Sequence, residues 1–348
     1  MKNNSPRLLR LAALVFVMLL TGSVHAQGRW LKLAPFPEPN EELIGAAAGG
    51  KMYVFGGYDA GKPKGIVYEY DPASDAWTKK KPMALPAHHM AIVEHGGKLY
   101  VFGGFVLSTQ GPSAWVPIGT VWQYDPATDN WKALAAMPTP RGASAAGVVG
   151  DKIYVIGGAA NAPGESGLRG GAAQQVLGTV EEYDIAKDEW RSRSPMLVPR
   201  NHAGAGVVNN KIIVAGGRIG AAWITMASNT DVVEEYDPAA DRWSALRARM
   251  PTARSGGAAV VWNGRLLYAG GEFQDSRMMA AFRALEAYDP VTNAWTLMPS
   301  MPLPRHGVAG AVIGNRLHLV SGDLQSAGSG HDMHTDAHDV FEFGSGGK

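Results

Sequence analysis

Short apolar runs alternate with clusters of glycine and small polar residues along most of this chain. Runs such as KMYVFGG (51–57) and DKIYVIGG (151–158) are rich in β-branched and aromatic residues and end in a glycine pair, which is typical of buried strands. Segments such as YDPASDAW (70–77) indicate a strand, a turn and a second strand, because Asp and Pro favour tight turns. The pattern predicts an all-β protein built from many short strands.

These signals return at a regular interval. Five glycine pairs and a degenerate sixth, Ser321-Gly322, are spaced 47, 54, 59, 54 and 51 residues apart. The five complete pairs are Gly56-Gly57, Gly103-Gly104, Gly157-Gly158, Gly216-Gly217 and Gly270-Gly271. A Tyr-Asp pair follows each of the five, and seven positions after the Tyr comes a Trp: Trp77, Trp131, Trp190, Trp243 or Trp295. A repeat of about 50 residues with four predicted strands is the signature of a propeller blade.

The repeated residues resemble the Kelch motif. Glycine pair, Tyr-Asp-Pro, spaced Trp and a following Met-Pro-x-x-Arg are present, and the resemblance runs from about residue 29 to residue 343. It implies a Kelch β-propeller with four antiparallel strands per blade, which we name a to d from the axis outward. Kelch propellers serve many roles, so the resemblance alone does not define a function.

The two ends of the chain are predicted to complete one blade together. The sixth repeat ends at Phe343 without a Trp, whereas Trp30 precedes Asn40 by the spacing that separates Trp131 from Arg141. We therefore expect residues 27–36 to supply the outer strand of the last blade, which removes exposed sheet edges. The prediction is a single six-bladed domain, residues 27–348, with repeats at about 40–86, 87–140, 141–199, 200–253, 254–304 and 305–343.

One face of the predicted ring carries the long loops. The a–b connections are tight hairpins, but the b–c connections contain 9, 16, 21, 15, 13 and 17 residues. They emerge beside the d–a loops that join the blades, and long loops on a rigid scaffold commonly carry recognition. Any ligand is therefore expected on this face, over the axis.

Two repeat positions in the d–a loops are candidate ligand contacts. The first holds an arginine in four repeats: Arg141, Arg200, Arg254 and Arg305. These arginines could contact a ligand or, as in the general Kelch pattern, bond blade carbonyls. Two residues further on, the position varies and includes His89 and His202. In known protein-binding Kelch domains, Arg at such places grips acidic peptides; the His at 202 departs from that pattern.

The b–c loops add three further candidates. Trp115 and Trp223 are expected to be exposed, where they could stack on a sugar or anchor a protein, or to form cores of their loops. Glu272 follows a glycine pair, with Arg277 on the same loop. The two could form a surface ion pair. They are also similar to the catalytic Glu and Arg of the periplasmic sialic-acid mutarotase (N-acetylneuraminate epimerase) Kelch family, which implies acid–base chemistry by Glu272 and carboxylate binding by Arg277.

A polar cluster near the end of the chain is a candidate metal site. His331, Asp332, His334 and Asp336 lie in the last b–c loop, and imidazole with carboxylate suits Zn, Cu or Ni. Their spacing matches no standard closed zinc motif, so they could equally be solvated. His338 and Asp339 fall at the start of the next strand and are expected to be structural.

Composition bears mainly on location. Basic residues Lys2, Arg7 and Arg10 precede an apolar run and a small-residue stretch ending at Ala26, which predicts a bacterial signal peptide over residues 1–26 and a periplasmic or secreted protein. Its removal takes the formal charge from +1 to −2, which gives no case for nucleic-acid binding. No later segment is apolar enough to span a membrane. The chain has no Cys, so it has no disulfide and cannot form the Tyr–Cys crosslink of copper radical oxidases.

These observations favour a binding scaffold over an enzyme. No Ser-His-Asp arrangement, phosphate loop or dinucleotide fingerprint is recognisable, and no cofactor is expected. The predicted function is recognition of a protein or carbohydrate ligand on the loop face. The alternative is a mutarotase of the sialic-acid type that uses Glu272 and Arg277. The sequence defines no oligomeric state.

Overall fold

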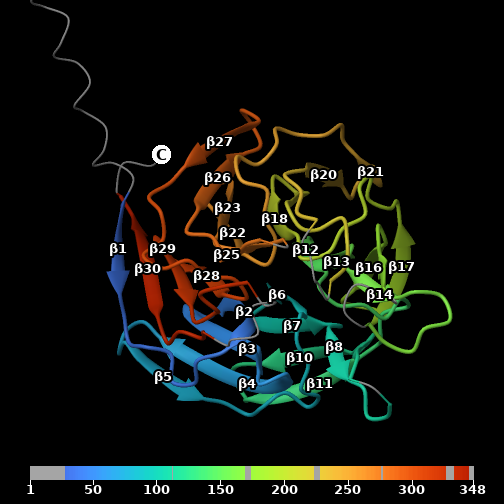
Figure 1. The fold of residues 1–348 in the computed structure, drawn as a ribbon, viewed down its shortest axis with the longest axis horizontal. Coiled ribbons are helices and arrows are strands. Elements are labelled where there is room, and N and C mark those ends of the chain that lie inside the picture. The colour runs from blue at the N-terminus through green and yellow to red at the C-terminus, as the bar shows by residue number, and fades with distance from the viewer. Residues whose placement is uncertain are drawn as a thin grey trace, which may run out of the picture.

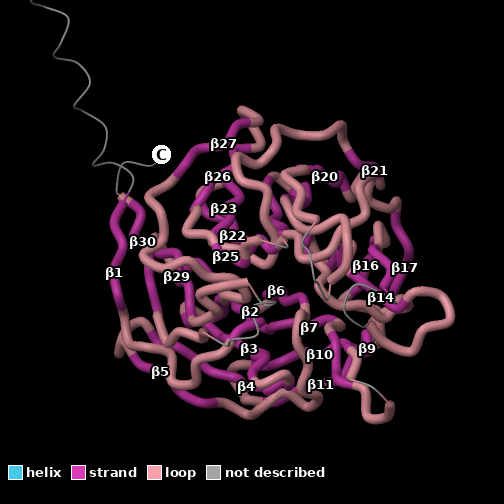
Figure 2. The backbone as a smooth tube through the Cα atoms, viewed as in Figure 1, coloured by secondary structure: helices cyan, strands magenta, loops and turns pink. Residues whose placement is uncertain are grey.

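The computed structural model shows a ring of six four-stranded antiparallel sheets around a central axis (Figure 1). It describes residues 28–111, 113–168, 174–222, 228–275, 277–326 and 333–344, so the predicted signal peptide lies outside the described residues. Within these residues every regular element is a strand, and loops join them throughout (Figure 2). No helix in the described part of the chain is long and apolar enough to cross a membrane.

The first three blades follow the predicted order from the axis outward. Blade one contains β2 (Glu41–Ala48), β3 (Lys51–Asp59), β4 (Lys62–Asp71) and β5 (Ala76–Lys79). Blade two contains β6 (Ala91–His95), β7 (Lys98–Phe102), β10 (Val121–Asp125) and β11 (Asn130–Leu134). Blade three contains β12 (Ala145–Val149), β13 (Lys152–Ile156), β16 (Val180–Asp184) and β17 (Glu189–Arg193).

The last three blades complete the ring. Blade four contains β18 (Gly204–Val208), β19 (Lys211–Ala215), β20 (Val233–Asp237) and β21 (Arg242–Trp243). Blade five contains β22 (Ala258–Trp262), β23 (Arg265–Ala269), β26 (Leu285–Asp289) and β27 (Ala294–Leu297). Blade six contains β28 (Ala309–Ile313), β29 (Arg316–Val320), β30 (His338–Phe343) and, outermost, β1 (Gly28–Lys32). The predicted six-bladed ring, closed by the N-terminal strand, is confirmed.

Three long b–c connections form small hairpins above the ring, which the sequence did not predict. They are β8 (Phe105–Leu107) with β9 (Trp115–Pro117), β14 (Ala159–Asn161) with β15 (Gln174–Val176), and β24 (Glu272–Gln274) with β25 (Met279–Ala281). Each starts directly after a glycine pair. These hairpins build up the face on which a ligand was expected.

The repeated Tyr, Asp and Trp residues connect neighbouring blades. In blade three, Asp188 Oδ1 accepts hydrogen bonds from Tyr183 Oη (2.6 Å) and from the Ala135 amide of the preceding blade (2.8 Å). Trp190 Nε1 donates to the Ala135 carbonyl at 2.8 Å. The same indole-to-carbonyl bond joins Trp30 to Pro299, which ties the closing strand to blade five at 3.1 Å. The Tyr, Asp and Trp of the motif therefore hydrogen-bond each sheet to the preceding one, which explains their strict spacing. We call these three residues of a blade its latch.

The inner strands are small because the blades converge at the axis. A Cβ added to Gly206 in β18 would lie 2.5 Å from the Val261 side chain of the next blade. Apolar side chains from adjacent sheets fill the space between blades further out, as with Ile213, Leu266 and Tyr288 between blades four and five. The six blades thus share one packing scheme, and their connecting loops differ more than their strands do.

Candidate functional site

The repeat-position arginines lie inside the blades. Arg141, Arg200, Arg254 and Arg305 are fully buried and pair with Glu181, Glu234, Glu286 and Asp339, respectively. Arg254 also donates to the carbonyls of Gly270, Tyr268 and Thr252 at 2.8–3.1 Å. Because every guanidinium is enclosed and bonded by its own blade, the prediction that these residues contact a ligand is wrong. They are structural.

The first two blades lack both members of this ion pair. Where the arginine is replaced by Asn40 or Ala87, the position of the glutamate in strand c holds Tyr68 or Trp122. An arginine and its acid are therefore present together or missing together. This correlation is what a blade-internal ion pair requires, since either partner alone would leave a buried charge.

The variable position two residues further on surrounds the axis. It is occupied by Glu42, His89, Ala143, His202, Gly256 and Gly307, all with positive φ between 52° and 65°. Their backbones form a chain of hydrogen bonds, in which each amide from Ala143 to Gly307 donates to the carbonyl of the same position in the preceding blade at 2.8–3.2 Å. We call these six residues the axial ring. It brings the predicted His89 and His202 together, with their ring centroids 4.7 Å apart.

A second set of equivalent residues stands directly after each glycine pair. It comprises Tyr58, Phe105, Ala159, Arg218, Glu272 and Asp323. Each pairs with the residue that precedes the axial ring: Glu41, His88, Gly142, Asn201, Ser255 or His306. Blades one to three thus contribute mainly aromatic side chains from the glycine-pair position, and blades four to six contribute charged ones. We call the region formed by these residues and the axial ring the mouth.

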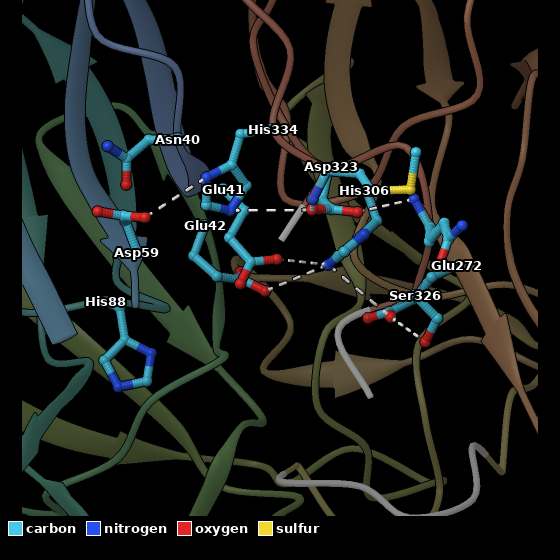
Figure 3. A network of polar contacts seen from close by, with 12 residues as sticks. Asn40, Glu41, Glu42, Asp59, His88, Glu272, His306, Asp323, Ser326 and His334 are labelled. Carbon is cyan, nitrogen blue, oxygen red and sulfur yellow. Dashed lines mark hydrogen bonds and ion pairs between the residues drawn. The ribbon is translucent and has the colours of Figure 1, made fainter. Parts of the chain in front are cut away.

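His306 is the centre of the charged part of the mouth (Figure 3). Its Nε2 lies 3.1 Å from Glu41, 3.8 Å from Glu42 and 3.9 Å from Glu272. Burial alone would lower the pKa of His306, but these carboxylates, Glu272 first, outweigh it and raise the pKa to about 10. His306 is therefore a buried imidazolium at neutral pH.

The carboxylates around His306 differ in their surroundings. Burial raises the pKa of Glu41, against the hydrogen bond and charge of His306. Burial would do the same to Glu42, but His89, 3.3 Å away, together with His306 lowers the pKa of Glu42 to about 2. The pKa values of these two neighbouring carboxyl groups are therefore shifted in opposite directions.

Glu272 pairs with an arginine that the sequence analysis did not single out. Its Oε1 accepts a bond from Arg218, and its Oε2 accepts one from Ser326 Oγ at 2.7 Å. Burial would raise the pKa of Glu272, but His306 and Arg218 together lower it. Arg277 is exposed, and its amide bonds Asp275. Both predicted arrangements of Glu272 with Arg277, a surface ion pair and a catalytic pair, are therefore wrong: the hairpin turns Glu272 into the mouth and leaves Arg277 outside.

The aromatic part of the mouth encloses Trp115. This residue is only 7% exposed, stacks against Phe105 and donates from Nε1 to Tyr58 Oη at 3.2 Å. Its expected exposure is wrong, and the alternative of a loop core holds. His88 packs edge-on against it, with ring centroids 4.6 Å apart, and burial holds the pKa of His88 well below its usual value. Trp223 lies outside the described residues.

Of the four residues of the predicted metal cluster, the structure describes only His334 and Asp336. His331 and Asp332 lie outside the described residues, and Asp336 is exposed. His334 instead faces Asp323, with Nε2 3.8 Å from Oδ2. His338 and Asp339 are buried in blade six, where His338 contacts the rings of Tyr70 and Trp77, so their structural role is as expected.

The residues that sequence reasoning missed are Arg218, Asp323, Glu41 and His306. A signal for them existed. Arg218 and Asp323 occupy the same repeat position as Glu272, directly after a glycine pair, and Glu41 and His306 directly precede the axial ring. Aligning the repeats on those two positions would have found the whole mouth.

Family comparisons agree with this architecture. Residues 17–162 match the KLHDC2/KLHL20/DRC7 Kelch-repeats domain, and residues 140–197, 199–248 and 253–302 match Kelch motifs. The solved structure of YjhT superposes with a TM-score of 0.70 at 18% identity, covering 88% of this chain and 96% of that chain, which shows a shared fold. The chain belongs to the Kelch-repeat β-propeller proteins.

Curated relatives share the repeats over part of their length. Kelch-like protein terF of Aspergillus terreus is 31% identical over 60% of this chain and 44% of its own. Kelch-like protein 15 of Danio rerio is 30% identical over 58% of this chain and 33% of its own. Alpha-scruin of Limulus polyphemus is 27% identical over 57% and 21%, respectively. This chain therefore spans less than half the length of these relatives.

Proposed function

We propose that the chain is a binding scaffold that holds a protein or carbohydrate ligand at the mouth, with the surrounding b–c hairpins as walls. One observation carries the proposal. The blades repeat their latch and core residues closely, yet at the mouth the six equivalent positions hold six different residues, from the aromatic Tyr58 to the basic Arg218 and the acidic Asp323. Polar diversity on an otherwise uniform frame is expected where a ligand is recognised.

The groups that could reach a ligand are those with residual exposure. Glu42, His89 and His202 on the axial ring are 9%, 7% and 8% exposed, and Tyr58 beside them is half-buried. A carboxylate and two imidazoles can exchange hydrogen bonds with hydroxyl or amide groups, and an aromatic face can carry a sugar ring or an apolar side chain. An acidic peptide is a poorer match, because the guanidinium of Arg200 is enclosed in its blade.

A thermal-shift screen with sugars and polar peptides tests this proposal. A true ligand should raise the unfolding temperature of the wild type, and the shift should disappear in His202→Asn and Glu42→Gln. Asp151→Asn is the matched control, because Asp151 lies in the a–b turn between β12 and β13, where it forms an ion pair with His95. Equal shifts in all variants would place the binding site elsewhere.

The second candidate is a carbohydrate mutarotase of the sialic-acid type, favoured by the pairing of Glu272 with Arg218 in the mouth. Glu272, whose pKa is lowered by His306 and Arg218, could take the proton of an anomeric hydroxyl and return it to the ring oxygen. Acceleration of sialic-acid anomer exchange followed by NMR, lost in Glu272→Gln, would support it. Exchange at the uncatalysed rate would refute it and leave the binding scaffold intact.

The proposed location is the periplasm or the exterior of the cell. It rests on the predicted signal peptide, residues 1–26. Sequencing the N-terminus of protein from fractionated cells should find a chain starting after Ala26. An uncleaved cytoplasmic chain would contradict the proposal.

A further inference from the structure

Three side chains at the seam between blades one and six converge on one point of the mouth. They are Glu41, at the start of β2, and Asp323 and His334, from the b–c connection of blade six. One ligand atom from each lies within 4.8 Å of the other two. Figure 3 shows His334 and Asp323 facing each other across this point. Bonds of about 2.1 Å to a tetrahedral metal place ligand atoms about 3.4 Å apart, so a small contraction would suffice.

The imidazole of His334 is placed to bind a ligand that is not a protein group. Its side chain is 9% exposed, and its Nε2 is enclosed without a hydrogen bond while lying 3.8 Å from Asp323 Oδ2. On its other side, Nδ1 faces Asp59 Oδ1 at 3.8 Å. Metal-binding histidines commonly present one nitrogen to the ion and turn the other toward a carboxylate.

Asp323 is held in position by the backbone around it. Its Oδ1 accepts a hydrogen bond from the Gln325 amide at 2.8 Å, and its Oδ2 accepts one from the Met333 amide at 2.6 Å. Each carboxylate oxygen retains a lone pair after one such bond. Glu41 is 6% exposed, so both carboxylates are enclosed, and enclosed carboxylates require positive charge nearby.

A second triad, Glu41 with Glu42 and His306, has a similar spacing but already contains a positive charge. The charged imidazole of His306 lies within 3.1–3.9 Å of three carboxylates and so takes the place that a cation would occupy. Among the described residues, Asp323 and His334 have no such cation between them, and His334 lies 3.8 Å from both Asp59 and Asp323.

We infer that Glu41, Asp323 and His334 form a binding site for a divalent transition-metal ion such as Zn²⁺. One imidazole and two carboxylates supply three ligands and leave a further position for water or a ligand group. Because Glu41 belongs to the first repeat and the other two residues to the sixth, the ion would join the blades on either side of the seam. It would raise the stability of the ring without taking part in the ligand contacts of the axial ring.

Titration of the chelator-stripped full chain with Zn²⁺ tests the inference. Calorimetry should find one tight site, and saturating Zn²⁺ should raise the unfolding temperature by about 5 °C, as expected for an ion at a hundredfold excess over its Kd. In His334→Gln the affinity should fall at least tenfold and the temperature shift should vanish. Mg²⁺ should give neither effect, because imidazole is not a ligand that it prefers.

Three further variants make the result decisive. Asp323→Asn should weaken Zn²⁺ binding as His334→Gln does. The unfolding temperature of the metal-free variant shows whether the substitution disturbs the fold. Asp336→Asn, on the same connection, and His331→Gln should bind Zn²⁺ like the wild type. Absence of binding, binding unchanged in His334→Gln, or loss confined to His331→Gln or Asp336→Asn would each overturn the site.

Discussion

Two buried arginine–glutamate pairs in this ring have the same chemistry but different surroundings. Arg254 and Glu286 lie within blade five, where the guanidinium is also bonded to three carbonyls. Arg218 and Glu272 lie in the mouth, where Glu272 also accepts a bond from Ser326 and lies 3.9 Å from His306. The blade pair is closed on itself, whereas the mouth pair is part of a network of several charges.

The difference shows which departures from the repeat carry information. The blade pair recurs in blades three, four and five and, with an aspartate, in blade six, so it belongs to the frame. The mouth pair occurs once and joins blade four to blade five. A buried ion pair costs desolvation, and a repeated one is explained by the blade that it holds together. The pair of Arg218 and Glu272 is not explained in this way, and we propose that it serves ligand binding.

The histidines of blade six and those of the mouth differ in a similar way. In blade six, burial lowers the pKa of His318 to about 3 and that of His338 to about 4, so both are neutral. The frame therefore excludes charge unless a dedicated partner is present. In the mouth, carboxylates raise the pKa of His306 to about 10, whereas burial lowers that of His88 and His202.

The largest expected effect comes from breaking a blade pair. Arg254→Met leaves the Glu286 carboxylate buried with Thr252 as its remaining hydrogen-bond partner in the described residues, and should lower the free energy of unfolding by about 4 kcal/mol. Urea denaturation measures it. The double variant Arg254→Met, Glu286→Leu should recover most of the loss, because blades one and two dispense with both charges. A double variant as unstable as the single one would show that the pair itself, not the stranded charge, is needed.

The second largest effect is expected from acidification, which should lower the free energy of unfolding through the neutral pair His318 and His338. Above pH 6.5 these histidines are neutral in both folded and unfolded chains, and they contribute no pH dependence. As the pH falls below 6.5, only the unfolded chain takes up protons, because the folded pKa values are about 3 and 4. Between pH 7 and pH 5 the two histidines together should lower the free energy of unfolding by about 3–4 kcal/mol.

The matched variant for this pH effect is His318→Tyr. Blades one, two and three hold Tyr53, Tyr100 and Tyr154 at the same repeat position, so tyrosine suits the site. In this variant about half of the stability loss between pH 7 and pH 5 that is assigned to the pair should disappear. Buried His88 and His202 act in the same direction, and their effect cancels when the variant is compared with the wild type. An unchanged pH dependence in urea denaturation would mean that the pair is not the source.

Removing the arginine of the mouth pair should cost less than removing that of the blade pair. In Arg218→Met, Glu272 keeps the charge of His306 and the hydroxyl of Ser326 nearby, so we expect a loss of about 2 kcal/mol. Denaturation of Arg218→Met beside Arg254→Met measures the difference. Equal losses would remove the distinction between a closed pair and a shared network.

Much of the frame could be predicted from the sequence because the frame is periodic. The latch residues Tyr183, Asp188 and Trp190 recur at fixed spacing, and ring closure followed from the position of Trp30. The mouth was harder to predict because its residues are unlike one another. Arg218 and Glu272 share a repeat position but no chemistry, and they meet only through the curvature of the ring.

Burial was the other property that periodicity could not supply. The position of Trp115 in a long loop indicated exposure, yet the loop forms a hairpin that packs its indole on Phe105. By their position alone, the repeated arginines could contact either a ligand or their own blade, and their contact with strand c decides for the blade. Their partner in strand c was visible in the sequence as a correlated glutamate, such as Glu181 or Glu234.

The smallest expected effect concerns the latch between blades. Asp188→Ala removes the acceptor for Tyr183 Oη and the Ala135 amide and places alanine at a φ of 57°, so the free energy of unfolding should fall by about 1 kcal/mol. Asp188→Asn should cost less than half as much, because Asn293 makes both bonds in blade five at 2.7 and 2.9 Å. If urea denaturation finds the two variants equally unstable, the carboxylate charge matters rather than its geometry. The latch would then resemble the mouth, where charge dominates, and the contrast between the two regions would be weaker than proposed here.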